Sequence, residues 1–238
     1  MSIINKSTSF KADIKTVMRD PILVMFFMLP AFYPILFKIV VKIITPIIYD
    51  YFSVNLVDYY GYILSFSILM TPLMLGSVAG FLMIDERDSK IQELIKITPI
   101  GYKGYVINRL MLPFVGSFMY SIVAYLLINI YKIDLLALLL VSFVAGLQAV
   151  LIGYLLYTLA ADKVQGLTYA KGFGVFSIIA MADIFNINWF TIIASLTPFY
   201  WITKLIVDYS LFTVVAALAV NIIYLLILLI TTKSYRYK

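Results

Sequence analysis

The charged residues with the most informative spacing lie between positions 85 and 100, in a chain that is otherwise strongly apolar. Glu86 and Lys90 stand four residues apart, the spacing at which opposite charges pair along one face of a helix, and apolar residues at helical spacing follow them. The pattern ends at Pro99, because the residue before a proline, here Thr98, avoids the α conformation. The segment predicts a short amphipathic helix. Its four acids against three bases favour contact with a protein over contact with anionic lipid, and a solvated loop helix without a partner is the alternative.

The residue types that usually carry catalysis are missing. The sequence contains no histidine and no cysteine, which removes imidazole bases, thiol nucleophiles, disulfides and the usual ligands of zinc. It has no paired intramembrane carboxylates and no G-x-x-x-x-G-K-[ST] loop for nucleotide phosphates. We therefore expect a protein that is not an enzyme and that binds no cofactor of its own.

The composition is that of a membrane protein. Hydrophobic residues make up 63% of the 238 positions and charged residues 13%, against about 45–50% and about 25% in soluble domains. A soluble fold cannot hide this excess, so soluble, disordered and fibrous classes are excluded. A helix needs about 20 apolar residues to cross a bilayer. The sequence predicts an all-α polytopic membrane protein with six transmembrane helices: Pro21 to about Ile44, Tyr60 to Ile84, Val106 to Ile130, Leu135 to Ala160, Leu167 to Asp183, and Leu211 to Thr231.

A further apolar stretch, from Trp189 to Ile206, is shorter and contains Pro198. It predicts a broken segment, re-entrant or interfacial, at the outer surface before the sixth span. The alternative is a seventh full span, which would place the two chain termini on opposite sides of the membrane.

The distribution of positive charge sets the expected orientation. With six spans, fourteen of the eighteen Lys and Arg residues fall on the side of the two termini, and positive residues concentrate on the cytoplasmic side. We expect a multi-pass protein of the cell membrane with both termini cytoplasmic and no contact with nucleic acid. The chain then divides into an amphipathic helix resting on the lipid membrane at 1–20, a transmembrane domain at 21–231 and a cytoplasmic tail at 232–238.

Few polar or small residues stand out within the predicted spans. Gln148 lies in the middle of the fourth span and Asn221 in the middle of the sixth, while Gly76 and Gly80 have the four-residue spacing that allows close helix packing. These residues either line a substrate path or hold helices together, and we favour the packing role. No carboxylate lies mid-bilayer, which argues against a proton- or sodium-coupled carrier.

Residues 86–100 resemble the ABC-2 family of ATP-binding-cassette exporter permeases. In that family the segment between the second and third spans reads acidic–basic–acidic, then apolar-x-Glu-Leu, then Ser/Thr-Pro-apolar. The chain departs from this pattern at Ser89-Lys90, where the family usually has Gly-Thr. The layout of spans and two further patches, 162–166 with Lys171 and 197–201, are similar to the family, within which multidrug, fluoroquinolone and antimicrobial-peptide export permeases look most alike. The matching residues are Glu86-Arg87-Asp88, Ile91, Glu93-Leu94 and Thr98-Pro99-Ile100.

The resemblance implies a permease subunit without its own ATPase site, which exports a hydrophobic or amphipathic compound such as a drug, an antimicrobial peptide or a lipid-like molecule. ATP and Mg²⁺ would bind to a separate ATPase subunit, and a second permease subunit, identical or different, would complete the exporter. The short cytoplasmic helix between spans two and three would be the coupling helix that sits in a groove of the ATPase. The alternative is an integral membrane immunity or assembly factor that transports nothing. The implied docking residues are Glu86, Arg87, Asp88, Glu93, Leu94, Thr98 and Pro99.

Overall fold

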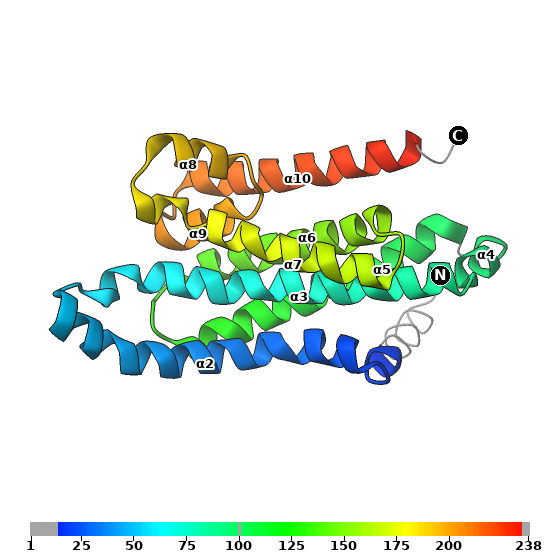
Figure 1. Cartoon of the computed structure of the whole chain (residues 1–238). Helices are drawn as coiled ribbons and strands as arrows, with labels where there is room; N and C mark the ends of the chain where they lie inside the picture. The colour runs from blue at the N-terminus through cyan, green and yellow to red at the C-terminus, as the bar shows by residue number, and fades with distance from the viewer. Residues whose placement is uncertain (1–13, 100, 235–238) are drawn as a thin grey trace.

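The computed structural model describes residues 14–99 and 101–234, and every regular element in these ranges is a helix (Figure 1). Five of the helices are long and apolar enough to cross a membrane, and a bent helix pair raises the number to six if it counts as one span. These helices confirm the predicted all-α polytopic membrane protein. The elements are α2 (Pro21–Phe52), η1 (Leu56–Tyr59), α3 (Tyr60–Asp88), α4 (Ile91–Lys96), α5 (Gly101–Ile128), α6 (Leu135–Leu159), α7 (Lys163–Ile179), η2 (Ala182–Phe185), α8 (Asn188–Ser195), α9 (Tyr200–Val207) and α10 (Leu211–Ser234).

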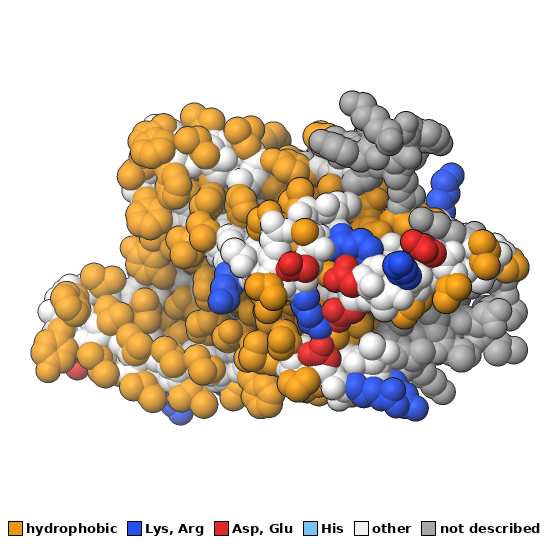
Figure 2. Space-filling view, turned by 45° about the vertical axis from the view of Figure 1, so that its right-hand side comes forward, with side chains coloured by type: hydrophobic (Ala, Val, Ile, Leu, Met, Phe, Trp, Pro, Cys, Tyr) orange, Lys and Arg blue, Asp and Glu red, His pale blue; other side chains and the backbone are white. Residues whose placement is uncertain are grey.

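The long helices lie side by side, with α4 at one end of the bundle and α8 at the other (Figure 1). We call these the α4 end and the α8 end. The beginning of α2 and the end of α10 both lie at the α4 end. On the face shown in Figure 2, charged side chains gather toward the α4 end, whereas apolar side chains cover most of the rest of that face. An apolar surface flanked by a charged end is the arrangement expected of a bundle immersed in lipid.

Helix α3 is the centre of the bundle. In its most apolar stretch 94% of the residues are buried, because α2, α5, α6, α7 and α9 all pack against it. Two glycines allow α6 to approach closely. A Cβ atom at Gly76 would lie 2.7 Å from the carbonyl oxygen of Ala149, and one at Gly80 would lie 2.7 Å from Cβ of Leu156. Both glycines therefore lie at a helix–helix contact, where a larger side chain would force α3 and α6 apart.

The predicted broken segment is the bent pair α8–α9, whose two helices depart from a straight line by 112°. Between them, the carbonyl oxygen of Pro198 accepts a hydrogen bond of 2.7 Å from Nε2 of Gln148, in the middle of α6. Helix α9 then returns to the α8 end, where Lys204 pairs with Asp183. The segment thus enters the bundle as far as the middle of α6 and turns back, so that it forms a re-entrant hairpin.

Helix α7 begins four residues earlier than predicted, at Lys163, and has 17 residues. The predicted 161–171 loop is therefore mostly helical, and Lys171 lies within the helix. At 1.5 Å per residue α7 is about 25 Å long, which is short for a span. Its ends nevertheless reach both ends of α3: Lys163 pairs with Asp85, and Asp183, just beyond α7, lines one cavity with Tyr62.

Most of the predicted N-terminal amphipathic helix lies outside the described residues. Residues 14–17 are helical, and Val17 is buried in an apolar cluster with Leu23 and Phe81. The chain then enters α2 through Asp20, whose carboxylate accepts a hydrogen bond of 2.8 Å from the amide of Ile22. Such an acidic cap satisfies amide groups that the first turn of a helix leaves free.

Candidate functional site

The first residue of the predicted docking segment, Glu86, faces into the protein. Its carboxylate accepts hydrogen bonds from the hydroxyl of Tyr105 at 2.6 Å and from Nε of Arg109 at 2.9 Å, and it pairs with Nη2 of the same arginine. The side chains of Glu86 and Arg109 are only 14% and 18% exposed. Because the pair joins the end of α3 to the start of α5, its first role is to hold these helices together.

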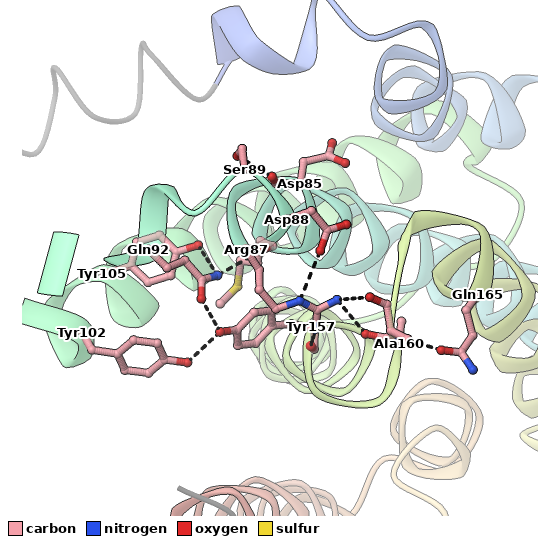
Figure 3. A network of polar contacts seen from close by, with 12 residues as sticks. Asp85, Arg87, Asp88, Ser89, Gln92, Tyr102, Tyr105, Tyr157, Ala160 and Gln165 are labelled. Atoms are coloured by element: carbon pink, nitrogen blue, oxygen red, sulfur yellow. Dashed lines mark hydrogen bonds and ion pairs between the residues drawn. The ribbon is translucent and has the colours of Figure 1, made fainter. Parts of the chain in front are cut away.

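The neighbouring Arg87 reaches across to the end of α6 (Figure 3). Its guanidinium group donates to the carbonyl oxygens of Tyr157 at 3.1 Å, Ala160 at 2.9 Å and Ala161 at 2.6 Å. The last carbonyls of a helix lack partners within the helix and carry partial negative charge, so a cation here is favourable. Arg87 therefore ties α3 to α6, and exposed Asp88 contacts it only at 3.5 Å.

A break in the backbone separates α3 from α4. Lys90 has φ of 59°, in the left-handed region, where a residue with a Cβ atom is strained by about 1–2 kcal/mol. Helix α3 ends at Asp88 and α4 begins at Ile91. Glu86 and Glu93 therefore belong to two different helices and do not share one helical face.

Gln92 is the residue that the sequence analysis missed. It is 7% exposed, and its Nε2 donates to the carbonyl oxygen of Met83 at 3.0 Å and to the hydroxyl of Tyr105 at 3.2 Å. Its Oε1 accepts a bond of 2.8 Å from the hydroxyl of Tyr157, which also bonds the hydroxyl of Tyr102 at 3.0 Å (Figure 3). One side chain thus attaches α4 to α3, α5 and α6. In the sequence, the tyrosines at the ends of two spans could have indicated this role of Gln92. The hydroxyl of a buried tyrosine needs a hydrogen-bond partner.

The opposite face of α4 is open. Glu93 is exposed, Leu94 is 65% exposed and Ile97 is 85% exposed. Thr98 and Pro99 are exposed as well. The structure therefore divides the predicted docking residues: Glu86 and Arg87 bind neighbouring helices, whereas Asp88 and the residues from Glu93 onward remain available at the surface.

The second patch of the family resemblance lies beside this site and joins three helices. Nζ of Lys163 contacts Asp20 at 2.5 Å and Asp85 at 2.8 Å. Burial opposes the charged form of Lys163, but its hydrogen bonds to the two carboxylates outweigh burial and raise its pKa. Burial also opposes ionisation of Asp20, whose pKa is nevertheless lowered by hydrogen bonds from Lys163 and backbone amides. Both shifts favour the ion pair that links α2, α3 and α7.

The polar residues predicted inside the membrane lie apart from the α4 end. Gln148 holds the tip of the re-entrant hairpin, as described above. Asn221 donates a bond of 2.8 Å to the carbonyl oxygen of Ala217, one turn back in its own helix α10. Both side chains are buried, and with Gly76 and Gly80 they lie at contacts between or within helices.

Comparison with known proteins places these features in a family. The chain matches the model of the Rv2686c-like fluoroquinolones export permease proteins over residues 13–232. Two relatives from Mycobacterium tuberculosis, fluoroquinolones export permease protein Rv2686c of strain ATCC 25618 / H37Rv and MT2760 of strain CDC 1551 / Oshkosh, are each 26% identical over 196 residues, which cover 81% of this chain and 77% of the relative. No solved structure matches. Because the match spans nearly the whole chain and agrees with the ABC-2 resemblance, the chain belongs to the Rv2686c-like family of fluoroquinolones export permeases.

Proposed function

We propose that this chain is the transmembrane subunit of an ATP-driven exporter of amphipathic, drug-like compounds, and that α4 receives a separate ATPase subunit. Export permease is the function named for its relatives. The sequence has no phosphate-binding loop, so ATP and Mg²⁺ bind to the partner. A second permease subunit completes the exporter. The α4 end faces the cytoplasm in this proposal, and the excess of positive charge on that side supports this orientation.

The observation that carries this proposal is the two-sided character of α4. One side is bound to the bundle through Gln92, and the other presents Leu94 and Ile97 beside the carboxylate of Glu93. Exposed apolar side chains bordered by charge are typical of a protein-binding surface. The ATPase groove covers the apolar pair and a basic group of the ATPase meets Glu93.

The hydrogen bonds between α4 and the bundle couple the exposed surface of α4 to the long helices. Gln92 contacts groups on α3, α5 and α6, and Arg87 ties α3 to the end of α6. A displacement of α4 by the ATPase is therefore passed to three long helices at once, because these bonds resist independent movement of α4.

The absence of cysteine allows a direct test. Leu94→Cys and Ile97→Cys, introduced separately, are expected to cross-link to a chain that carries a phosphate-binding loop, identified by mass spectrometry of the exporter in its native membrane. Ser53→Cys is the matched control and gives no such product, because Ser53 follows the end of α2 that lies away from α4. The α4 cysteines react with an impermeant thiol reagent only after the cells are opened, whereas Ser53→Cys reacts in intact cells.

Transport is measured in parallel with inverted membrane vesicles. ATP-dependent uptake of a fluoroquinolone that disappears in Leu94→Asp supports the proposal. Normal uptake in Leu94→Asp, or the absence of any ATPase cross-link from α4, contradicts docking at this helix. A non-transporting membrane factor shows no ATP-dependent uptake with the wild-type chain.

A further inference from the structure

The exposed face of α7 differs from that of α10. Helix α7 packs on α3 through one side, where Gly166 lies so close to Phe81 that a Cβ atom would be 3.1 Å from its ring. The opposite side combines polar and small residues with three aliphatic ones. The exposed residues are Val164, Gln165, Thr168, Lys171, Gly172, Val175 and Ile178.

Helix α10 shows what a lipid-facing surface of this protein looks like. Its exposed residues within the described side chains are all apolar, from Leu211 and Phe212 to Leu229 and Ile230. Lipid tails offer no hydrogen bonds to polar groups, so polar side chains on membrane helices face a protein interior or a hydrated cavity. The part of the α7 face from Gln165 to Lys171 is therefore better suited to a hydrated or protein-lined space than to lipid tails.

Lys171 is the charged group of this face. It lies eight residues beyond Lys163, a rise of about 12 Å along the helix from the charged α4 end. No hydrogen-bond or ion-pair partner of Lys171 is found in the described part of the chain, whereas Lys38 of α2 donates to the carbonyl oxygen of Leu127 at 3.0 Å. Next to Lys171, the space around the Cα atoms of Gly172 and Gly174 is open, with no neighbouring atom within 4 Å of an added Cβ.

We propose that Lys171 binds the carboxylate of the exported compound, at a site on the α7 face where Gly172 and Gly174 leave room for its apolar ring system. An ammonium group without a partner attracts an anion, and the attraction is stronger where water is partly excluded than in bulk water. Fluoroquinolones, the compounds in the names of the relatives, carry a carboxylate on a flat aromatic ring. The inference rests on the proposed export function and narrows its cargo to amphipathic carboxylates.

The test measures binding to the purified full chain in nanodiscs of phosphatidylcholine, without ATPase. The probes are norfloxacin and its ethyl ester, which differ only in the carboxylate, and their own fluorescence reports binding. The wild-type chain is expected to bind the acid about tenfold more tightly than the ester, which is about 1.4 kcal/mol. Equal affinity for acid and ester, or no binding of either, overturns the inference.

Variants locate the site. Lys171→Ala is expected to weaken binding of the acid about tenfold and to leave binding of the ester unchanged, while Lys171→Arg retains the preference for the acid. Lys103→Ala, at an exposed lysine of α5, is the matched control and behaves as wild type. Unchanged affinity of Lys171→Ala for the acid overturns the proposal.

A lipid headgroup is the other source of an anion for Lys171. In nanodiscs that contain phosphatidylglycerol, native mass spectrometry counts the anionic lipids retained by each variant. Loss of a retained lipid in Lys171→Ala, with unchanged affinity for norfloxacin, assigns the lysine to a lipid phosphate and overturns the proposal. Because these measurements need no ATPase, their failure leaves the docking of α4 to be decided by its own cross-linking test.

Discussion

Gln92 at the α4 end and Gln148 in the middle of α6 are both buried glutamines, but their amide groups are satisfied to different extents. Nε2 and Oε1 of Gln92 both have partners, on three different helices. Nε2 of Gln148 bonds the hairpin tip, whereas its Oε1 has no partner in the described part of the chain. The difference shows that the α4 end is a closed polar network and that the hairpin region is an incomplete one.

Other unpaired groups lie on α6 and α9, which flank the hairpin tip, and on the neighbouring helices α3 and α10. Buried oxygen atoms without a hydrogen bond occur on α3, α6, α9 and α10 within the described residues. A buried polar group without a partner costs about 1–3 kcal/mol, so the contacts in the hairpin region lose less on separation than the fully paired contacts at the α4 end. The α4 end is therefore suited to transmit a displacement and the hairpin region to undergo one. The atoms are Oγ of Ser67 and Ser142, Oε1 of Gln148, Oγ1 of Thr203 and Oδ1 of Asn221.

The largest expected effect is that of Glu86→Ala, which opens the closed network. It leaves the largely buried guanidinium of Arg109 without its carboxylate, and such a loss costs about 3–5 kcal/mol. We expect a lower midpoint of thermal unfolding in detergent and less folded protein in the membrane. The exposed Glu93→Ala is the control, with a change within about 0.5 kcal/mol. Equal stability of the two variants would show that the α4 end is not the rigid region.

An intermediate effect is expected for Gln92→Leu, which keeps the apolar volume but removes the three hydrogen bonds of the amide. Leaving their buried partners unsatisfied costs about 1–3 kcal/mol. With α4 detached from α5 and α6, ATP hydrolysis by the complex should continue while uptake into inverted vesicles falls. Lys103→Ala, at an exposed lysine of α5, should keep hydrolysis and uptake in their normal ratio. A normal ratio in Gln92→Leu would contradict coupling through this residue.

The smallest effect is expected for Gln148→Leu. It removes the donor to Pro198, but it also removes the unpaired Oε1, so the two changes in stability oppose each other and the net loss is about 1 kcal/mol or less. The hairpin should nevertheless move more freely, and Ser195→Cys at its tip should react faster with a thiol reagent in this background. A stability loss as large as that of Gln92→Leu would remove the contrast between the two regions.

The family resemblance located the segment that we propose as the docking site, but not the contacts of its residues. Charge and Pro99 predicted a helix between spans two and three, and α4 is that helix. The same charges also placed Glu86 on the docking surface, whereas its carboxylate is bound to Arg109. A charged residue beside a membrane span can face solvent or a neighbouring helix, and its own sequence position does not distinguish them.

By itself, the sequence determined the membrane class, the approximate positions of the long helices and the break at Pro198, because length, hydrophobicity and proline act locally along the chain. Tertiary structure alone decided which polar groups are paired. The partners of Gln92 come from Met83, Tyr105 and Tyr157, on three different helices. The left-handed turn at Lys90 separates α3 from α4, the helix that carries Gln92. The burial and pairing of a polar side chain depend on the groups that folding brings next to it, so they follow from the packing of the helices.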